Sequence, residues 1–490
     1  MPKYVLGINV SGFISSACLL QDGKIIAASS EERFSRIKRD NSFPHNAIKF
    51  CLVKAGINFE DLDCISSGWN PRFYLQKSSN SISNTLKERG LFLHYIANEL
   101  GSSGYAPQIS GISEQIRLEN GKEVKIEFID HHLSHAAYAF HFSGLEESLV
   151  LCLDGFGEIH TGGTFHFTRN DHKTLTSAKF PHSLGMVYST FTQFFGFRPN
   201  SDEWRIMALS ALGKNEYYDE IDKMFKVTTN AFNKLLEVDL SFFDFFNFFT
   251  KEYYSDKFIE VFGQPITNKQ QLTQKQFDIA KSLQLVIEDK VVEILDDLKK
   301  NNPEQNNICL TGGFFMNSVL NGQITSRTKF RNPKIGPCPD DSGTSIGSAF
   351  FSARKSNTLS TKYTHDYFGP EYANSDILDV IKISKLSYKE LDDHVADAAK
   401  NLSDGKIIGW FQGKSEFGQR ALGNRSILAS PIFPWMKDEI NKYIKFREEF
   451  RPFAPSILDE EKTKYFEITE DEDVLVMEKV FPFKENVRYK

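Results

Sequence analysis

Apolar residues at the start of the chain fall into short runs separated by turn residues. The run YVLGINV, residues 4–10, is followed by SACLLQDGKIIAASSEERFSR, in which Asp22-Gly23 lies between two apolar stretches. An Asp-Gly pair in this position is typical of a tight β-hairpin. Similar blocks begin near residues 124 and 307, each with a buried run that ends in an acidic or glycine turn. The repetition predicts an α/β fold with a duplicated domain whose turns converge on one site.

The segment from about residue 215 to residue 284 has a different pattern. It is rich in phenylalanine, as in SFFDFFNFFTKEYY, and its apolar spacing predicts helices. We expect a helical insertion whose phenylalanines belong to the core or to a lid packed on it. Further on, SARKSNTLSTKYTHDYFGPEYANS is polar and contains Gly369-Pro370, which predicts a domain boundary near residue 360. The expected domains are therefore residues 1–360 and a smaller unit, residues 361–490.

Composition limits the function classes. The 490 residues are 40% hydrophobic and 25% charged, as in ordinary globular proteins. The net charge of −6 is spread along the chain, so duplex nucleic acid is not expected as the main partner. The first apolar run is broken by Gly7, Asn9 and Ser11, which argues against a signal peptide or a membrane span. Six cysteines without CxxC pairs favour a cytoplasmic protein.

Three histidines occur within the short stretch DHHLSHAAYAF, residues 130–140. His131 and His135 are four positions apart, so on a helix their imidazoles lie on one face within reach of one ion. Asp154 and Asp341 each follow an apolar stretch, where a turn can project a carboxylate into the same site. Two imidazoles with carboxylates predict a divalent transition metal such as iron, manganese or zinc. The alternative is that the histidines only stabilise the start of a helix.

Two glycine-containing turns are candidate anion-binding sites. In TGGFFMNSVLNG, Gly312 and Gly313 lie at a strand end, and Asn317 and Asn321 lie on one face of the following helix. In DDSGTSIGSAF, Ser342 and Gly343 open a helix of small residues. Backbone N–H groups at such turns can hold a phosphate, and a helix N-terminus adds a favourable dipole. The alternative is close packing of small side chains.

Cationic side chains gather in two motifs of the C-terminal unit. The stretches GWFQGKSEFGQRALGNRSILASP and INKYIKFREEFRPFAPSIL alternate them with aromatic, small and proline residues. Side chains held on such an apolar frame suit phosphate or carboxylate recognition, and arginine adds a planar fork. The overall acidity favours a small anionic ligand over a polynucleotide. The candidate residues are Lys414, Arg420, Arg425, Lys445, Arg447 and Arg451.

Taken in order, these motifs resemble one family, the O-carbamoyltransferases of the nodulation-factor, tobramycin and cephamycin type. The resemblance also rests on DGFGE and HSLGMVYSTFTQFFGFRPNSDEWRIMAL, and it runs from residue 6 to about residue 458. It implies a duplicated actin-like large domain, similar to the enzyme that places threonylcarbamoyl on tRNA, and a small YrdC-like α+β domain. It further implies that carbamoyl phosphate and ATP give carbamoyl adenylate, whose carbamoyl group passes to a hydroxyl of a sugar or other natural product.

The same resemblance assigns roles to residues of this chain. The family's iron-type metal ligands fall on the four metal candidates named above. Its carbamoyl phosphate and nucleotide contacts fall on Arg420 and Lys445, which become the expected catalytic residues. Magnesium is expected to accompany ATP, and the resemblance makes a homodimer a reasonable assembly.

Two departures from the family pattern stand out. Phe13-Ile14 occupy the place of a His-Asp pair at the transfer site, and phenylalanine neither accepts a proton nor donates a hydrogen bond. His45 and His160 are candidate substitutes. The chain also ends at VFPFKENVRYK, before a further block of the family pattern. The YrdC-like domain is therefore expected to be shortened, with an open edge that a partner would complete.

Other function classes remain open at this point. A non-catalytic or split homologue would bind metal and nucleotide without turnover. A metal-dependent hydrolase could use HHLSH, but no HExxH motif accompanies it. A sugar kinase of the same actin-like fold would transfer phosphate without carbamoyl phosphate and would leave the Arg420 to Arg451 region without a role. The identity of the hydroxyl acceptor does not follow from the residues.

Overall fold

The computed structural model describes residues 3–11, 13–70, 112–117, 120–227, 235–247, 250–267, 272–354, 362–472 and 474–487. The domain boundary expected near residue 360 therefore lies outside the described residues. Among the helices described, none is long and apolar enough to cross a membrane.

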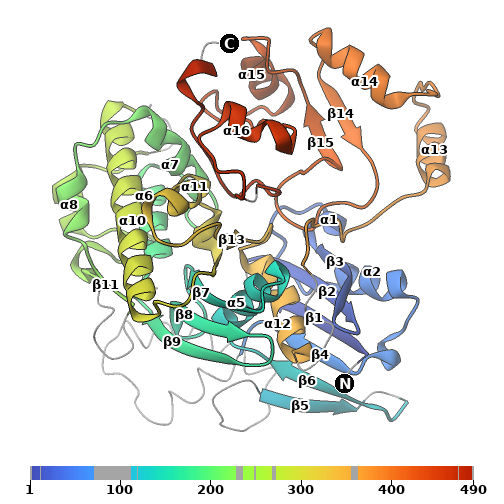
Figure 1. Cartoon of the computed structure of the whole chain (residues 1–490), viewed down its shortest axis with the longest axis horizontal. Coiled ribbons are helices and arrows are strands. Elements are labelled where there is room, and N and C mark those ends of the chain that lie inside the picture. The colour runs from blue at the N-terminus through green and yellow to red at the C-terminus, as the bar shows by residue number, and fades with distance from the viewer. Residues whose placement is uncertain are drawn as a thin grey trace.

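The first half of the large domain is built on a six-stranded sheet with the order β3-β2-β1-β4-β6-β5 (Figure 1). β1, β2 and β3 form an antiparallel meander, and β4 and β6 continue the sheet parallel to β1. Asp22 and Gly23 both have positive φ and join β2 to β3, which confirms the predicted hairpin. The bounds are β1 Tyr4–Val10, β2 Ser15–Gln21, β3 Lys24–Ser30, β4 Cys64–Ser67, β5 Ile112–Arg117 and β6 Glu123–Phe128.

The second half repeats this topology in a five-stranded sheet with the order β13-β12-β7-β8-β9. β7, β8 and β9 form the antiparallel meander, and β12 and β13 continue the sheet parallel to β7. Strand order and strand directions therefore match those of the first sheet, which confirms the predicted duplicated α/β domain. The bounds are β7 Glu147–Leu153, β8 His160–Thr168, β9 His172–Lys179, β12 Ile308–Thr311 and β13 Lys334–Ile335.

Helices α5 (His131–Ser143) and α12 (Thr344–Ala353) lie side by side between the two sheets (Figure 1). α12 packs on β1, β2 and β4, whereas α5 packs on β7, β8 and β12. Their close approach requires Gly347, because a Cβ at this position would lie 1.8 Å from the carbonyl oxygen of Ser134. The two helices thus join the halves of the domain, and both begin near the ends of β1 and β7.

The remaining helices of the large domain cover the sheets. α1 and α2 belong to the first half, and α10 is the long helix of the second half (Figure 1). α10 begins with a capping box at Thr273 and buries an apolar stripe against α6, α7 and α8. The bounds are α1 Glu32–Ser35, α2 His45–Ala55, α6 Leu184–Phe194, α7 Glu203–Leu209, α8 Tyr218–Asp222, α9 Asp256–Phe262, α10 Gln274–Asn301 and α11 Ser318–Arg327.

The predicted helical insertion is only partly helical. Between α8 and α9 lie the short strands β10 (Phe225–Val227) and β11 (Leu236–Val238), and the described part of SFFDFFNFFTKEYY holds one 3₁₀ turn. The helix prediction was wrong there, because tertiary contacts bury the rings without a helical period. The expectation that these phenylalanines belong to the core is confirmed for the rings that the structure describes. The buried rings are Phe242, Phe243, Phe245 and Phe246.

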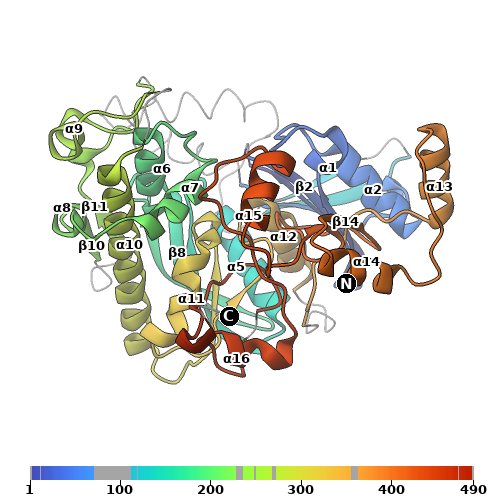
Figure 2. The same cartoon turned by 90° about the horizontal axis from the view of Figure 1, so that it is seen from above.

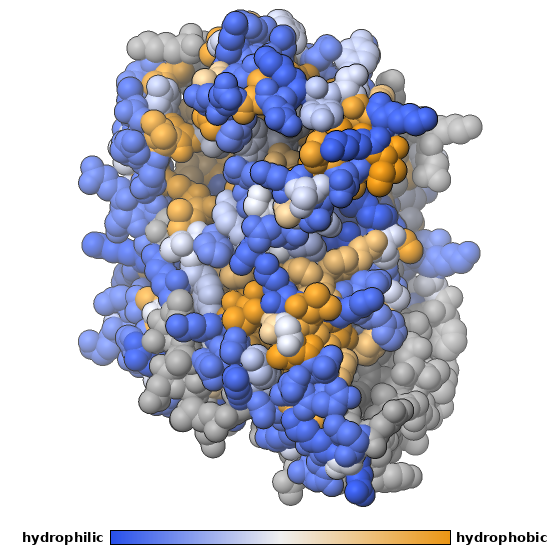
Figure 3. Space-filling model, turned by 90° about the vertical axis from the view of Figure 1, so that its right-hand side faces the viewer, coloured by the Kyte–Doolittle hydropathy of each residue, from blue (hydrophilic) through white to orange (hydrophobic). Residues whose placement is uncertain are grey.

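The C-terminal unit, residues 362–487, has little core of its own in the part that is described. Its sheet is the antiparallel pair β14–β15, and no residue of α13 or α14 is buried. Figure 3 looks at the side of the molecule where α13 lies and shows apolar patches between polar ones. The expected YrdC-like fold of this unit stays a prediction. The bounds are α13 Asn374–Ile383, α14 His394–Ser403, β14 Ile408–Phe411, β15 Arg425–Leu428, α15 Met436–Glu439 and α16 Lys462–Tyr465.

The end of the C-terminal unit is anchored on α11 of the large domain, near which α16 also lies (Figure 2). Asn321 Nδ2 donates to the Glu478 carbonyl at 2.7 Å, and the Val480 N–H donates to the Ser318 carbonyl at 3.0 Å. Gly322 allows this approach, because a Cβ on it would lie 1.8 Å from the Val480 carbonyl oxygen. The final segment therefore packs directly against α11, the helix that follows the Gly312-Gly313 turn.

We expect Gly322→Ala to separate this segment from α11. The added methyl group cannot fit against the Val480 carbonyl, so the free energy of unfolding should fall by about 1–3 kcal/mol, as for other overpacked sites. Thermal unfolding and limited proteolysis of residues 462–487 measure the effect. Gly409→Ala is the matched control, since no atom lies within 4 Å of the position of its Cβ. Equal stability and equal cleavage of the two variants would contradict the docking described here.

Candidate functional site

Four side chains from separate elements meet where α5 and α12 begin. His131 and His135 lie in the first turns of α5, Asp154 directly follows β7, and Asp341 starts the short 3₁₀ turn before α12. All four are buried, and one ligand atom of each lies within 4.8 Å of the others. The structure therefore brings together all four residues predicted as metal ligands.

The distances within this cluster are those of one compact polar site. His131 Nε2 lies 3.2 Å from His135 Nε2 and 3.2 Å from Asp154 Oδ2. Asp341 Oδ1 lies 3.7 Å from both imidazole Nε2 atoms. His131 Nε2 is an acceptor when Nδ1 carries the proton, so the short contact between the two Nε2 atoms requires a proton on His135 Nε2 or a cation shared by both rings.

Neighbouring groups orient the cluster from outside. His131 Nδ1 lies 3.1 Å from the Gly68 carbonyl, a contact that places the proton on Nδ1 and leaves Nε2 free to bind. The Gly313 N–H donates to Asp154 Oδ1 at 3.0 Å, and Ser11 Oγ donates to Asp341 Oδ2 at 2.6 Å. Each carboxylate thus has one oxygen fixed by a donor and the other turned toward the histidines, as metal-ligating carboxylates do.

The electrostatics of the cluster follow from burial and from mutual attraction. Burial alone lowers the pKa of His131, but Asp341 and Asp154 outweigh it and raise that pKa well above its usual value. Burial also raises the pKa of Asp154, yet hydrogen bonds from His131 and His135 hold it well below its usual range. In the absence of metal, the raised histidine pKa and the lowered aspartate pKa favour protonated imidazole beside ionised carboxylate.

Glu158 is a functional neighbour that the sequence reasoning missed. Its carboxylate accepts the backbone N–H groups of His131 at 3.0 Å and Asn70 at 2.6 Å, so it fixes the start of α5. Burial, followed by the charge of Asp130, raises the pKa of Glu158 to about 8. The only signal for this residue was an acid at the end of DGFGE. Ser11 carried no signal, because one serine in a turn is common.

The N–H groups of Gly312, Gly313 and Gly343 in the two glycine turns donate to acceptors within the protein, and the anion-binding role expected for these turns stays a prediction. The Gly312 N–H donates to the Pro339 carbonyl at 2.9 Å, while the Gly313 N–H holds Asp154. Asn317 exchanges hydrogen bonds with Gln284 and caps α11. At the second turn, Ser342 Oγ donates to Asp340 Oδ1 and the Gly343 N–H to the Asp340 carbonyl. The first turn therefore positions the carboxylate of Asp154, and the second turn holds Asp340, the neighbour of Asp341.

Among the predicted cationic residues, Arg420 and Arg425 line one cavity of about 410 Å³. Arg425 is fully engaged by the protein, because it donates to the carbonyls of Gln412, Asn424, Pro370 and Gly413 and stacks on Phe411. Arg425 thus has a structural role here, and its expected role as a ligand contact stays a prediction. Lys414 borders the same loop, where its carbonyl accepts from Asn424 Nδ2 at 2.6 Å.

Lys445, Arg447 and Arg451 do not line that cavity and form a second cationic group. Burial and the two neighbouring arginines lower the pKa of Lys445. Arg447 donates to Asn441 Oδ1 at 2.6 Å, and Arg451 stacks on Trp204 of the large domain at 3.7 Å. The C-terminal anion site expected from the sequence therefore stays a prediction, with Lys445, Arg447 and Arg451 outside the lining of this cavity.

The two positions that depart from the family pattern lie at the turn after β1. The Phe13 ring packs edge-on against Phe156 at 5.6 Å, and Ile14 is buried. Of the histidines considered as substitutes, His160 lies closer to the metal cluster, with its ring 6.5 Å from that of His132, whereas His45 is exposed at the start of α2. The turns after β1 and β7 occupy corresponding places in the duplicated domain. They contact each other through the rings of Phe13 and Phe156.

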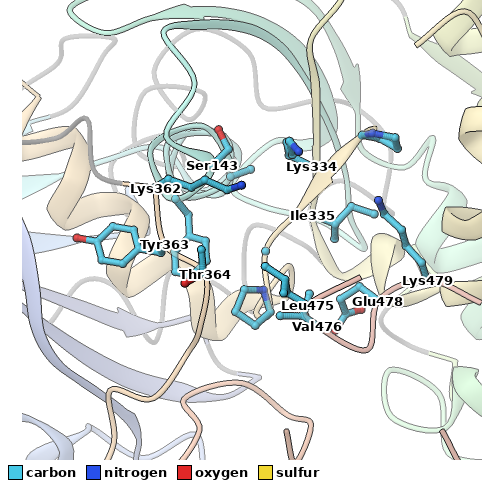
Figure 4. Close-up of a pocket in the computed structure, with 15 residues that line it drawn as sticks. Ser143, Lys334, Ile335, Lys362, Tyr363, Thr364, Leu475, Val476, Glu478 and Lys479 are labelled. Atoms are coloured by element: carbon cyan, nitrogen blue, oxygen red, sulfur yellow. The ribbon is translucent and has the colours of Figure 1, made fainter. Parts of the chain in front are cut away.

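A smaller cavity of about 60 Å³ lies between the final segment and β13 (Figure 4). Leu475, Val476 and Glu478 of the final segment line it together with Ile335 and residues 362–364. Burial raises the pKa of Glu478 to about 8, so its carboxyl group is mostly protonated at neutral pH. The cavity is too small for a nucleotide.

Three relatives match most of this chain. An uncharacterised protein of Synechocystis is 34% identical over 95% of this chain and 77% of its own length. The nodulation protein NolNO of Sinorhizobium fredii is 30% identical over 96% of this chain and 66% of its own length. The 3'-hydroxymethylcephem-O-carbamoyltransferase of Streptomyces clavuligerus is 26% identical over 74% of this chain and 65% of its own length.

Family models for carbamoyltransferases match both parts of the chain. The model described as the carbamoyltransferase N-terminus matches residues 4–350, which include the whole metal cluster. The model described as the carbamoyltransferase C-terminus matches residues 399–490, which include both cationic groups. The chain belongs to the carbamoyltransferase family.

Proposed function

We propose that the chain is an ATP-dependent O-carbamoyltransferase. Water would first cleave carbamoyl phosphate to carbamate and phosphate, and a carbamate oxygen would then attack the α-phosphorus of ATP, giving carbamoyl adenylate and releasing pyrophosphate. Attack by an acceptor hydroxyl on the carbamoyl carbon would then break the bond to the adenylate oxygen, release AMP and leave a carbamate ester. The family match over residues 4–350 and 399–490 carries the proposal, and the named cephem O-carbamoyltransferase supports a small-molecule hydroxyl as the acceptor.

The buried His/Asp cluster fits a divalent metal. Two imidazole nitrogens and two carboxylate oxygens converge from His131, His135, Asp154 and Asp341, and each carboxylate is oriented by an outer donor. When bound there, such an ion supplies Lewis-acid stabilisation of negative charge on a carbonyl or phosphoryl oxygen. The donor set suits iron, manganese or zinc. The protein's own part is to hold the four ligands rigid and out of water.

The two cationic places in the C-terminal unit suit a reaction with two phosphate-bearing substrates. Arg420 lines the larger cavity, and Lys445 belongs to the second group with Arg447 and Arg451. Guanidinium and ammonium groups at separate places can neutralise carbamoyl phosphate and the ATP phosphates at the same time. Carbamoyl adenylate is a mixed anhydride that water destroys, so its formation and its use must occur in sites closed to bulk water.

A non-catalytic homologue is the second candidate function. Phe13 and Ile14 offer no group that takes a proton from the acceptor hydroxyl, and the glycine-turn N–H groups are already paired within the protein. Such a protein would bind metal and nucleotide without forming products. Turnover therefore decides between the two candidates.

We expect the purified chain to release pyrophosphate from ATP only when carbamoyl phosphate is present. Arg420→Ala should lower this rate at least about a hundredfold, because a charge-assisted contact to a phosphate is lost. Pyrophosphate and AMP are measured with and without carbamoyl phosphate. Lys400→Ala, at a lysine on the exposed helix α14, is the control and should keep the full rate. ATP binding without any turnover would instead support the non-catalytic homologue.

We also expect stoichiometric metal in the purified protein and its loss in Asp341→Asn. Removing one charged ligand should weaken metal binding at least about a hundredfold, and Ser11→Ala, which removes only the outer donor to Asp341, should weaken it about tenfold. Metal content and the effect of a chelator on thermal unfolding are the measurements. His45→Gln changes an exposed histidine and should behave as wild type. A chelator-insensitive wild-type protein without metal would overturn this assignment.

A further inference from the structure

The larger cavity lies where α1 of the large domain meets the C-terminal unit (Figure 1). Its large-domain wall contains Arg33 and Arg36, and its other wall contains Arg420 and Arg425. The volume of about 410 Å³ is in the range of small-molecule sites. Arginines from two units of the chain thus border one cavity.

Several polar atoms around this cavity lack a partner. Arg33 Nη2 donates to the Gly418 carbonyl at 2.9 Å, which brings the two walls together. Arg33 Nε, Arg420 Nε and Ser415 Oγ are buried and have no hydrogen-bond partner among the described residues. Buried polar groups are almost always paired in folded proteins, so three unpaired donors beside one cavity indicate a polar ligand.

The charges that face the cavity leave it cationic. Glu416 Oε1 is committed to the backbone N–H groups of Leu422 at 2.7 Å and Asn424 at 2.9 Å. Burial raises the pKa of Glu478 to about 8, so this neighbour of Arg420 is mostly neutral at pH 7. Asp366 lies beside Arg33, and burial raises its pKa to about 6, so it offsets that one charge. Arg36 and Arg420 keep a net positive charge at the cavity.

We infer that Arg33 and Arg36 form, together with Arg420, a composite site for the phosphate group of a substrate. The inference rests on the proposed function, which supplies carbamoyl phosphate and ATP as the phosphate-bearing ligands. It adds the EERFSR segment of the large domain to a site that the sequence placed wholly in the C-terminal unit. A phosphate held by both walls would bridge the two units and pull them together.

Binding to the full chain tests this site without reference to turnover. Carbamoyl phosphate, ATP and inorganic phosphate are titrated separately by calorimetry, so that the source of the phosphate is identified. Arg36→Gln is the main variant, because Arg36 is exposed and already has a positive φ that glutamine can share. Arg33→Lys is the second variant and keeps the charge while losing the fork. Arg169→Gln, an exposed arginine paired with Glu146, is the control.

The expected result is a roughly ten- to hundredfold loss of affinity in Arg36→Gln and Arg33→Lys for at least one ligand, with Arg169→Gln unchanged. The same ligand should protect the junction of α1 and residues 415–425 from protease in wild type only. Wild-type affinity in both variants, with normal turnover, would overturn the composite site and leave the proposed function intact. Arginine-dependent binding without carbamoyl-phosphate-dependent turnover would support the site and overturn the proposed function.

Discussion

The close packing of α5 against α12 is the contact on which the candidate site depends. Gly347 lets the two helices approach until its Cα lies against the Ser134 carbonyl, and any side chain there would force them apart. Because His131 begins one helix and Asp341 precedes the other, a shift between them would separate the metal ligands directly. The two repeated sheets hold these helices from both sides, so the rigidity of the site comes from the duplicated fold.

The His/Asp cluster contains opposite charges that stabilise one another, because an isolated charge would be too costly to bury. Two carboxylates and two imidazoles are buried together. Each charge is tolerated because its attraction to the opposite charges outweighs the cost of removing it from water. Outer donors such as Ser11 Oγ and the Gly313 N–H then decide which oxygen of each carboxylate faces inward. A divalent ion would replace the protons on the imidazoles and satisfy the same carboxylates.

The C-terminal unit depends on the large domain for much of its order. Its helices α13 and α14 bury no residue, whereas its contacts with the large domain are specific. Arg33 donates to the Gly418 carbonyl, Gln419 donates to Asp340 beside Asp341 of the His/Asp cluster, and the Val480 N–H donates to the Ser318 carbonyl on α11. The sites proposed in the two units therefore lie on either side of one junction. A movement of residues 416–420 would shift Asp340 and, with it, the neighbouring Asp341 of the His/Asp cluster.

The sequence by itself determined the features that depend on local chemistry. Turn residues fixed the hairpin at Asp22-Gly23, and the spacing of His131 and His135 placed two ligands on one helical face, because both rules act within a few residues. Only the tertiary structure decided which acceptors the backbone N–H groups and the guanidinium groups bind. It assigned the Gly313 N–H to Asp154, surrounded Arg425 with carbonyls, and brought Arg33 to the cavity of Arg420. The type of a residue limits which groups it can bind, but its actual hydrogen-bond partner depends on which distant segment packs beside it.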